Sequence, residues 1–477
     1  MNRRFAANVA VLVFVNLLIK PLWIFGIDRT IQNTVGPATY GAYFVLFNFS
    51  FLLQTLLDFG INNYNSRAVA QNHDWIETHF SGILTVKLFL SLGYLILCLL
   101  GAWILGYKNF DLYLLLILCF NQILLSFITY FRSNLQGLHR FRSDSFMSVL
   151  DRILMILICS AILWGGVLPP PFKIQWFVYA QTAGYFLTAM VGIGLVAGHL
   201  KKPVFNFDRE FLTGILRKSY PFALIGVLMS IYHRIDSVML EKILPEEGAF
   251  QAGIYASAYR ILDAANMIGV LLSTILLPMF ARMLIKKESV EKLVGFASKG
   301  LFSFAAAGAI SCFFFRESIM NWLYADATPY YASVFGWLIL SFIAISSVYV
   351  FGAFLTANNN LWQINLIALV SVGINVGLNL LLIPQFKAIG SSWSALITQS
   401  FAALAFIIVA IKNLSLPVRF LEIFKCICYL LLCSGISIAA TQINFFSWQL
   451  SFLLSFFVCL LTAWLIGLLS IRTTMNF

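Results

Sequence analysis

The sequence predicts an all-α integral membrane protein with about 14 transmembrane helices. Of its 477 residues 61% are hydrophobic and only 10% are charged, whereas a soluble domain carries about a quarter charged residues. Apolar runs of about 20 residues, the length that crosses a hydrocarbon core of roughly 30 Å, recur from one end to the other. No long polar stretch is left over for a soluble domain.

Turn residues such as Gly36-Pro37, Pro169 to Pro171 and Pro329 separate the predicted spans. We read the basic start Met1-Asn2-Arg3-Arg4 and the apolar run after it as the first span, because the run is too long for a signal peptide. The fourteen predicted ranges are 5–27, 38–60, 80–106, 110–131, 145–168, 174–199, 218–243, 250–280, 294–315, 330–356, 361–383, 389–411, 420–440 and 447–471.

Basic residues fix the predicted orientation. The net charge is +12, and most of the 31 Lys and Arg residues fall in the loops of one side when fourteen spans are counted. Loops rich in Lys and Arg stay in the cytoplasm. We therefore predict a multi-pass protein of the inner (plasma) membrane with both termini cytoplasmic.

The chain repeats itself. Tyr40 to Tyr43 and Ala252 to Tyr255 open the second and eighth spans, and Pro171-Phe172-Lys173 and Pro384 to Lys387 precede the sixth and twelfth. The two pairs share nearly one offset, and six spans per half make the repeats parallel. We predict two six-helix lobes related by a pseudo-twofold axis, a rocking transporter with its substrate site between them. The predicted parts are 1–199 (first lobe), 200–217 (cytoplasmic linker), 218–412 (second lobe) and 413–477 (two extra helices).

Five blocks of the sequence are familiar as a set: Tyr40-Gly41-x-Tyr43 to Asp58-Phe59-Gly60, Arg234 to Leu240, Gly253 to Arg260, Leu277 to Arg282 and Asn375 to Trp393. They resemble Wzx-type polysaccharide and O-antigen flippases of the MOP exporter superfamily, which also holds lipid II flippases and multidrug extruders. The resemblance covers nearly the whole chain in order. It implies translocation of a polyprenyl-diphosphate-linked oligosaccharide from the cytoplasmic to the periplasmic leaflet, for synthesis of O-antigen, capsule or exopolysaccharide.

Such a headgroup is anionic and strongly hydrated, so a protein that moves it needs a polar, cationic cavity. Charges inside spans are rare and cost about 2.5–3.5 kcal/mol each on insertion scales. Lys20, Arg234 and Arg260 are therefore the candidate diphosphate-binding residues. The competing interpretation is structural pairing, and for Arg260 the partner would be Asp263, three residues on along the same helical face.

Asp236 and Asp263 are candidates for coupling transport to H+ or Na+, since a carboxylate in a low-dielectric cavity can bind and release an ion. A fixed counter-ion to an arginine is the equal alternative. No cofactor or metal site is predicted.

Asp58 and Arg67 are the candidate residues of a cytoplasmic gate, and two roles are open for Asp58: pairing with Arg67 or capping the gate. The alternative is a simple turn at the helix end, with Gly60 at the C-cap. Lys87 and Arg152 lie about two turns from the cytoplasmic face. We expect both side chains to extend to the interface.

No P-loop or catalytic constellation is present, so an enzyme is not predicted. An ion-coupled drug or metabolite antiporter of the same superfamily remains an alternative, although the charges in the spans are mixed to basic. A membrane polysaccharide polymerase or ligase is a weaker alternative, because it would need a larger outer loop.

The expected partners are the lipid-linked glycan, membrane lipids and other polysaccharide assembly proteins. Nucleic acid is not an expected partner, because the basic residues lie in short loops.

Overall fold

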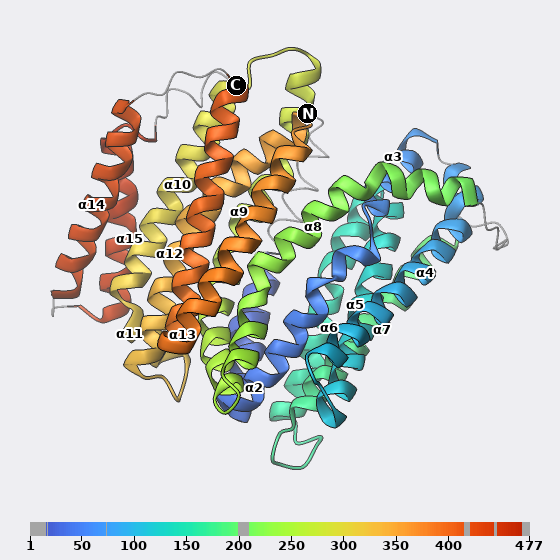
Figure 1. The fold of residues 1–477 in the computed structure, drawn as a ribbon, viewed down its shortest axis with the longest axis horizontal. Helices are drawn as coiled ribbons and strands as arrows, with labels where there is room; N and C mark the ends of the chain where they lie inside the picture. Colours follow the sequence, from blue (N-terminus) through green and yellow to red (C-terminus); the bar gives the residue numbers. More distant parts are fainter. Residues whose placement is uncertain are drawn as a thin grey trace. The chain divides into compact units, whose positions relative to one another are not determined.

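The computed structural model describes residues 16, 18–72, 74–198, 209–414, 420–442 and 446–469 (Figure 1). Most of the predicted first span, much of the linker and both termini lie outside these residues. In the described part of the chain every regular element is a helix, as the sequence predicts. The elements in chain order are the π-helix η1 (Leu22–Asp28), α2 (Arg29–Leu52), the 3-10 helix η2 (Gln54–Leu57), α3 (Ile61–Gln71), α4 (Asp74–Ile104), α5 (Asn109–Gly137), α6 (Phe141–Trp164), α7 (Ile174–Ala197), α8 (Arg209–Ile243), α9 (Gly248–Ile285), α10 (Glu291–Phe314), α11 (Arg316–Leu323), α12 (Pro329–Ala357), α13 (Leu361–Leu414), α14 (Phe420–Gln442) and α15 (Trp448–Leu465).

Eleven single helices of the described chain are long and apolar enough to cross a membrane, and the bent stretch from Leu18 to Gln71 makes twelve. Two of these stretches each contain a chain reversal. The Tyr40 hydroxyl donates to Asp28 Oδ2 at 2.7 Å, although twelve residues of straight helix would separate them by about 18 Å. Gly36 breaks that helix with φ 78° and ψ 164°, a conformation open to glycine.

The second reversal is inside α13. Lys387 has φ 53° and ψ −130°, and the Ser394 hydroxyl donates to the Asn375 carbonyl at 3.1 Å across nineteen residues. A Cβ on Gly390 would lie 2.5 Å from the Leu382 carbonyl oxygen, so this turn has no room for a larger residue. Divided at Gly36 and Lys387, the described helices supply one segment for each of the fourteen predicted spans.

The second predicted span, 38–60, is not one continuous helix. Its α-helical part ends at Leu52, η2 follows, and the chain turns at Phe59 (φ 48°) and Gly60 (φ 79°) before α3 begins. The helical directions before and after the break differ by 47°. Gly60 thus occupies the left-handed turn position predicted for it, but a further helix, α3, continues beyond the turn.

Backbone contacts divide the described chain into two compact units. The first unit ends at Lys242, and the second begins at Ile243. In the first unit α5 is the central helix and packs against α2, α3, α4, α6 and α7. In the second unit α12 is central and packs against α9, α10, α11 and α13. These two helices are the fourth and tenth predicted spans, which are equivalent positions in the repeat.

The extra helices α14 and α15 lie side by side and pack on α10 (Figure 1). Their inner faces carry small polar groups: the Ser455 hydroxyl contacts those of Ser311 at 3.2 Å and Ser437 at 2.9 Å. Tyr429 donates to the Ser303 carbonyl at 2.9 Å. Small residues such as these serines let membrane helices approach closely, where burial of apolar surface provides no driving force for association.

The helix α8, which the repeat assigns to the second lobe, groups with the first unit. Three contacts explain this. Ser237 accepts a hydrogen bond from Asn48 of α2 at 2.9 Å, Tyr107 donates to Glu241 at 2.5 Å, and the Lys242 ammonium lies 3.6 Å from the Tyr107 ring centroid. Burial and the neighbouring Glu241 carboxylate together raise the pKa of Tyr107, which keeps this hydroxyl a donor.

Candidate functional site

Lys20 belongs to a group of charges inside the first unit. Its half-buried ammonium interacts electrostatically with Arg152 and Asp151 of α6 and with Arg132 of α5. Arg152 Nε lies 3.7 Å from Asp151 Oδ2, and its guanidinium lies over the rings of Trp23 at 5.4 Å and Tyr185 at 6.0 Å. We refer to Lys20, Asp151 and Arg152 as the Lys20 cluster.

The Lys20 cluster has more positive than negative charge. The three side chains carry two positive charges and one negative charge, while the nearby Arg132 has its own carboxylate, Asp144, at 2.7 Å. Asn16 donates to Ser148 of α6 at 3.1 Å and so fixes the first span against α6 one turn away from the cluster. An excess of positive charge at membrane depth stabilises an anion rather than a cation.

Arg234 is held by α2. Its Nη1 donates to Asn48 Oδ1 at 3.0 Å, and its guanidinium lies 4.2 Å from the Phe51 ring centroid. The Asn48 amide also donates to Ser237, one turn further along α8. The guanidinium plane is therefore oriented by a hydrogen bond and by a cation–π contact, which restricts its rotamers.

The two aspartates predicted for ion coupling have different surroundings. Asp236 is buried, with 2% of its surface exposed. Asp263 lies 3.8 Å from Arg260 Nη1 in the ion pair that their spacing predicts. Both side chains of this pair are part-buried in α9 of the second unit, so Arg260 has a counter-ion on its own helix.

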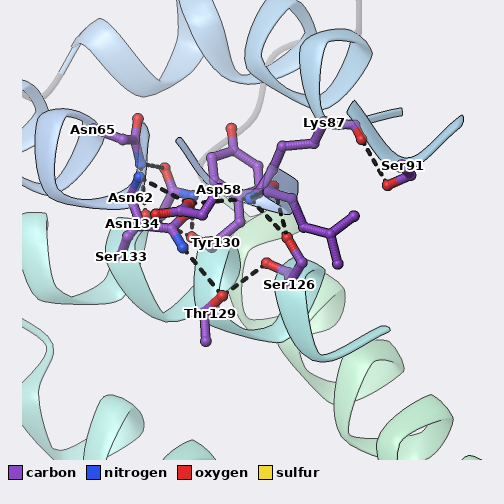
Figure 2. A network of polar contacts seen from close by, with 11 residues as sticks. Asp58, Asn62, Asn65, Lys87, Ser91, Ser126, Thr129, Tyr130, Ser133 and Asn134 are labelled. Carbon is purple, nitrogen blue, oxygen red and sulfur yellow. Dashed lines mark hydrogen bonds and ion pairs between the residues drawn. The ribbon is translucent and has the colours of Figure 1, made fainter. Parts of the chain in front are cut away.

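A polar network surrounds the break between α2 and α3 (Figure 2). The Lys87 ammonium of α4 donates to the Leu57 carbonyl at 3.1 Å, to Asp58 Oδ1 at 3.2 Å and to the Ser126 hydroxyl of α5 at 2.9 Å. The turn at Phe59 and Gly60 interrupts the helical hydrogen bonds, which leaves the Leu57 carbonyl in need of donors. Lys87 and Ser126 supply them, so this lysine stabilises the broken helix.

The prediction for Lys87 was wrong. Only 1% of its side chain is exposed, so it does not extend to the interface. Of the two roles considered for Asp58, pairing with Arg67 is not observed: Asp58 pairs with Lys87, and no ion pair joins Asp58 to Arg67 in the part of the chain that the structure describes. Arg67 lies exposed on α3. The Asp58 carboxylate also caps α3, where it accepts a hydrogen bond from the Asn62 backbone N–H at 3.2 Å.

The network continues along α3 (Figure 2). Asn62 donates to Thr129 at 3.1 Å, and Asn65 donates to Ser133 at 2.9 Å and to Asn134 at 3.0 Å. These bonds join α3 to α5. The signal in the sequence was the recurrence of Asn at 62 and 65 on α3 and of hydroxyl and amide residues at 126, 129, 133 and 134, one face of a helix.

A second polar cluster holds the reversal of α13 in the second unit. Lys387 donates to Glu247 at 2.6 Å, and Tyr330 donates to Gln251 at 2.9 Å. The Ala388 backbone N–H, freed by the turn, donates to the Tyr330 hydroxyl at 3.1 Å. This cluster ties the start of α9 and the start of α12 to a turn whose Lys387 has a positive φ.

Glu247 gives this cluster a defined pH dependence. The hydrogen bond from Lys387, followed by its positive charge, holds the pKa of Glu247 below the ordinary glutamate value of about 4.3. A depressed pKa means that the pair stabilises the fold above the unfolded-state pKa and that this contribution is lost as pH falls through the folded-state pKa.

We therefore expect Glu247→Gln to lower the thermal midpoint of the purified protein at neutral pH. The difference from the unsubstituted protein should shrink as the pH falls below the unfolded-state pKa, and it should vanish once the carboxyl of the folded state is protonated as well. Thermal unfolding followed by tryptophan fluorescence across this range measures it. Glu246→Gln, at an exposed neighbour, is the control, and a difference that persists unchanged at low pH would contradict the assignment.

Among the described residues, no group of three or more His, Cys, Asp and Glu side chains is placed to hold a metal ion. Sequence reasoning missed Arg152 as a member of the Lys20 cluster, because an arginine two turns from a span end is usually interfacial. The adjacent Asp151 was the available signal, since neighbouring opposite charges inside a span indicate pairing.

Comparison with solved structures shows the fold. The lipid II flippase MurJ in an inward closed conformation superposes with a TM-score of 0.73 and 13% identity, covering 98% of this chain and 99% of that chain. An inward-facing multidrug resistance MATE family transporter of the MOP superfamily gives 0.63 and 15%, covering 85% and 98%. A MOP superfamily transporter from Pyrococcus furiosus gives 0.62 and 16%, covering 86% and 95%.

Sequence comparison shows the family. An uncharacterised membrane protein of Methanocaldococcus jannaschii is 26% identical over 209 residues, which is 42% of this chain and 46% of that protein, so the match spans less than half of either chain. The family model described as polysaccharide biosynthesis protein matches residues 5–284, more than half of the chain. With the fold of the MOP superfamily and this match, the chain belongs to the polysaccharide biosynthesis protein family.

Proposed function

We propose that this protein is a flippase that moves a polyprenyl-diphosphate-linked oligosaccharide from the cytoplasmic to the periplasmic leaflet, for assembly of a surface polysaccharide. The family and the fold are those of transporters and flippases. The proposal includes an inner-membrane location with both termini in the cytoplasm. Sugar hydroxyls and a diphosphate cannot cross hydrocarbon unaided, because each unpaired polar group costs several kcal/mol there.

The observation that carries the proposal is the positive charge of the Lys20 cluster. Lys20 and Arg152 both interact electrostatically with Asp151 inside predicted spans, so two cations are near one carboxylate. An anionic headgroup requires this balance of charge, and a cationic drug does not. We assign diphosphate binding to Lys20, Arg234 and Arg260. The arginines offer a planar fork of donors to phosphate oxygens, and the lysine acts as a point charge.

The second candidate function is ion-coupled antiport of a drug or metabolite. The buried Asp236 favours it, because a carboxylate in a low-dielectric interior is suited to bind and release H+ or Na+. In the flippase proposal the same residue, with Asp263, would couple translocation to an ion.

The test is depletion of the protein in its native cell, followed by mass spectrometry of the lipid extract. We expect a complete polyprenyl-diphosphate-linked repeat unit to accumulate while surface polysaccharide is lost. Expression of the unsubstituted chain should restore both, and expression of Lys20→Ala should not. If the lipid pool and the surface glycan both stayed unchanged, the antiporter would replace the flippase as the proposed function.

A further inference from the structure

An apolar groove lies between α5 and α7 on the exposed surface of the first unit. It is lined by Tyr113, Leu116, Ile117 and Phe120 of α5 and by Tyr179, Thr182, Ala183 and Phe186 of α7, and its volume is about 600 Å³. On each helix the lining follows the spacing i, i+3, i+4 and i+7, so one stripe of each helix faces the groove. Seven residues of helix give the groove a length of roughly 10 Å.

The side chains that line the groove make it apolar. Small side chains, Thr182 and Ala183, lie between the bulky Tyr179 and Phe186, which leaves a hollow along α7. The only hydroxyl in the middle of the groove belongs to Thr182, and it donates to the Val178 carbonyl of its own helix at 3.0 Å. Thr182 therefore has no need of a polar ligand, and a hydrocarbon chain is the occupant that such a lining stabilises.

Two tyrosines close one end of the groove. The hydroxyls of Tyr113 and Tyr179 are 2.9 Å apart, and both side chains are exposed. Both residues lie in the second turn of their helices, so this bond also shows that the N-termini of α5 and α7 lie at the same end. Tyrosines of this kind mark the boundary between the hydrocarbon core and the polar headgroups.

Positive charge lies just beyond the tyrosines. The residues that precede α5 and α7 are both lysines, Lys108 and Lys173, and both are exposed. The residue that precedes each helix makes no side-chain capping hydrogen bond. The Asp111 and Trp176 N–H groups donate to the Lys108 and Lys173 carbonyls, which leaves the first two N–H groups of each helix to an acceptor. Asp111 places one carboxylate in the first turn of α5, and the two ammonium groups with the two helix dipoles outweigh it, so this place favours an anion.

We propose that this groove is a binding site for an anionic glycerophospholipid of the leaflet in which α5 and α7 begin. One acyl chain lies in the groove, and the phosphate lies at Lys108, Lys173 and the two helix N-termini. The order along the helix axis, charge, then tyrosine pair, then about 10 Å of hydrocarbon groove, is the order of a phospholipid from headgroup to chain. The site is separate from the Lys20 cluster and does not depend on the proposed transport activity.

Native mass spectrometry of the full chain, released from nanodiscs of defined composition, tests the proposal. We expect phosphatidylglycerol to remain bound more strongly than phosphatidylcholine with the same acyl chains, by roughly 30-fold if two lysines contribute independently. Ala183→Trp, which fills the groove, should remove retention of both lipids. Lys108→Gln with Lys173→Gln should remove only the preference for phosphatidylglycerol.

Two controls match these variants. Leu92→Trp adds the same side chain on the exposed face of α4, and Lys286→Gln with Lys287→Gln removes the same charge elsewhere. Both should bind lipid as the unsubstituted chain does. The proposal is overturned if Ala183→Trp binds phosphatidylglycerol normally or if the lysine pair leaves the preference intact. It is equally overturned if a neutral polyprenol displaces phosphatidylglycerol from the groove, which would assign it to an isoprenyl tail, or if a dimer is lost with Ala183→Trp.

Discussion

Replacing Lys87 by methionine is expected to destabilise the protein by roughly 3 kcal/mol, because loss of one partner from a buried ion pair leaves the other charge uncompensated. The value is at the lower end of the usual range because 29% of the Asp58 side chain is exposed and can regain some hydration. Methionine has a similar length, so cavity formation adds little. Thermal or denaturant unfolding in detergent measures the change.

A double-substitution cycle separates the ion pair from general damage at this site. Asp58→Asn combined with Lys87→Met should be less destabilising than the sum of the two single changes, since neither partner is then charged. Arg67→Ala is the matched control, an exposed cation on α3 nearby. If Lys87→Met proved as stable as Arg67→Ala, the role of this lysine in holding the broken helix would be refuted.

Arg234→Ala is expected to lower the initial rate of lipid-linked glycan translocation by about 10- to 100-fold, the equivalent of a lost charge-assisted hydrogen bond of about 1.5–3 kcal/mol. Arg234→Lys should retain an intermediate rate, because it keeps the positive charge but loses the planar fork and the contact with Phe51. The measurement is translocation of a fluorescent lipid-linked glycan in proteoliposomes at equal protein content.

The variant Asn48→Ala distinguishes between two roles of Arg234, substrate binding and a structural contact. This change removes the hydrogen bond that orients the guanidinium but keeps its charge. If Arg234 binds the diphosphate, Asn48→Ala should lose far less activity than Arg234→Ala. Equal losses would mean that the contact between α2 and α8 is what matters, and normal transport by Arg234→Ala would exclude the assignment altogether.

The sequence by itself determined the class of the protein and the positions of its spans. Apolar runs of about twenty residues can be read locally, because a membrane helix satisfies its own backbone hydrogen bonds whatever surrounds it. The blocks that resemble the flippase family are also short, continuous stretches of sequence, so they can be recognised without the fold. The Arg260–Asp263 pair was foreseen for the same reason, since residues three apart on a helix are neighbours in any fold.

Only the tertiary structure decided which charges are partners across helices. Asp58 and Lys87 are 29 residues apart in the chain, and Arg234 and Asn48 are 186 apart. No periodicity predicts such contacts, so the only partner considered for Asp58 was its nearer neighbour Arg67, and the Lys87 side chain was expected at the interface. The break at Phe59 and Gly60 leaves the Leu57 carbonyl without a helical donor. The buried Lys87 ammonium of another helix donates to this carbonyl and so stabilises the break.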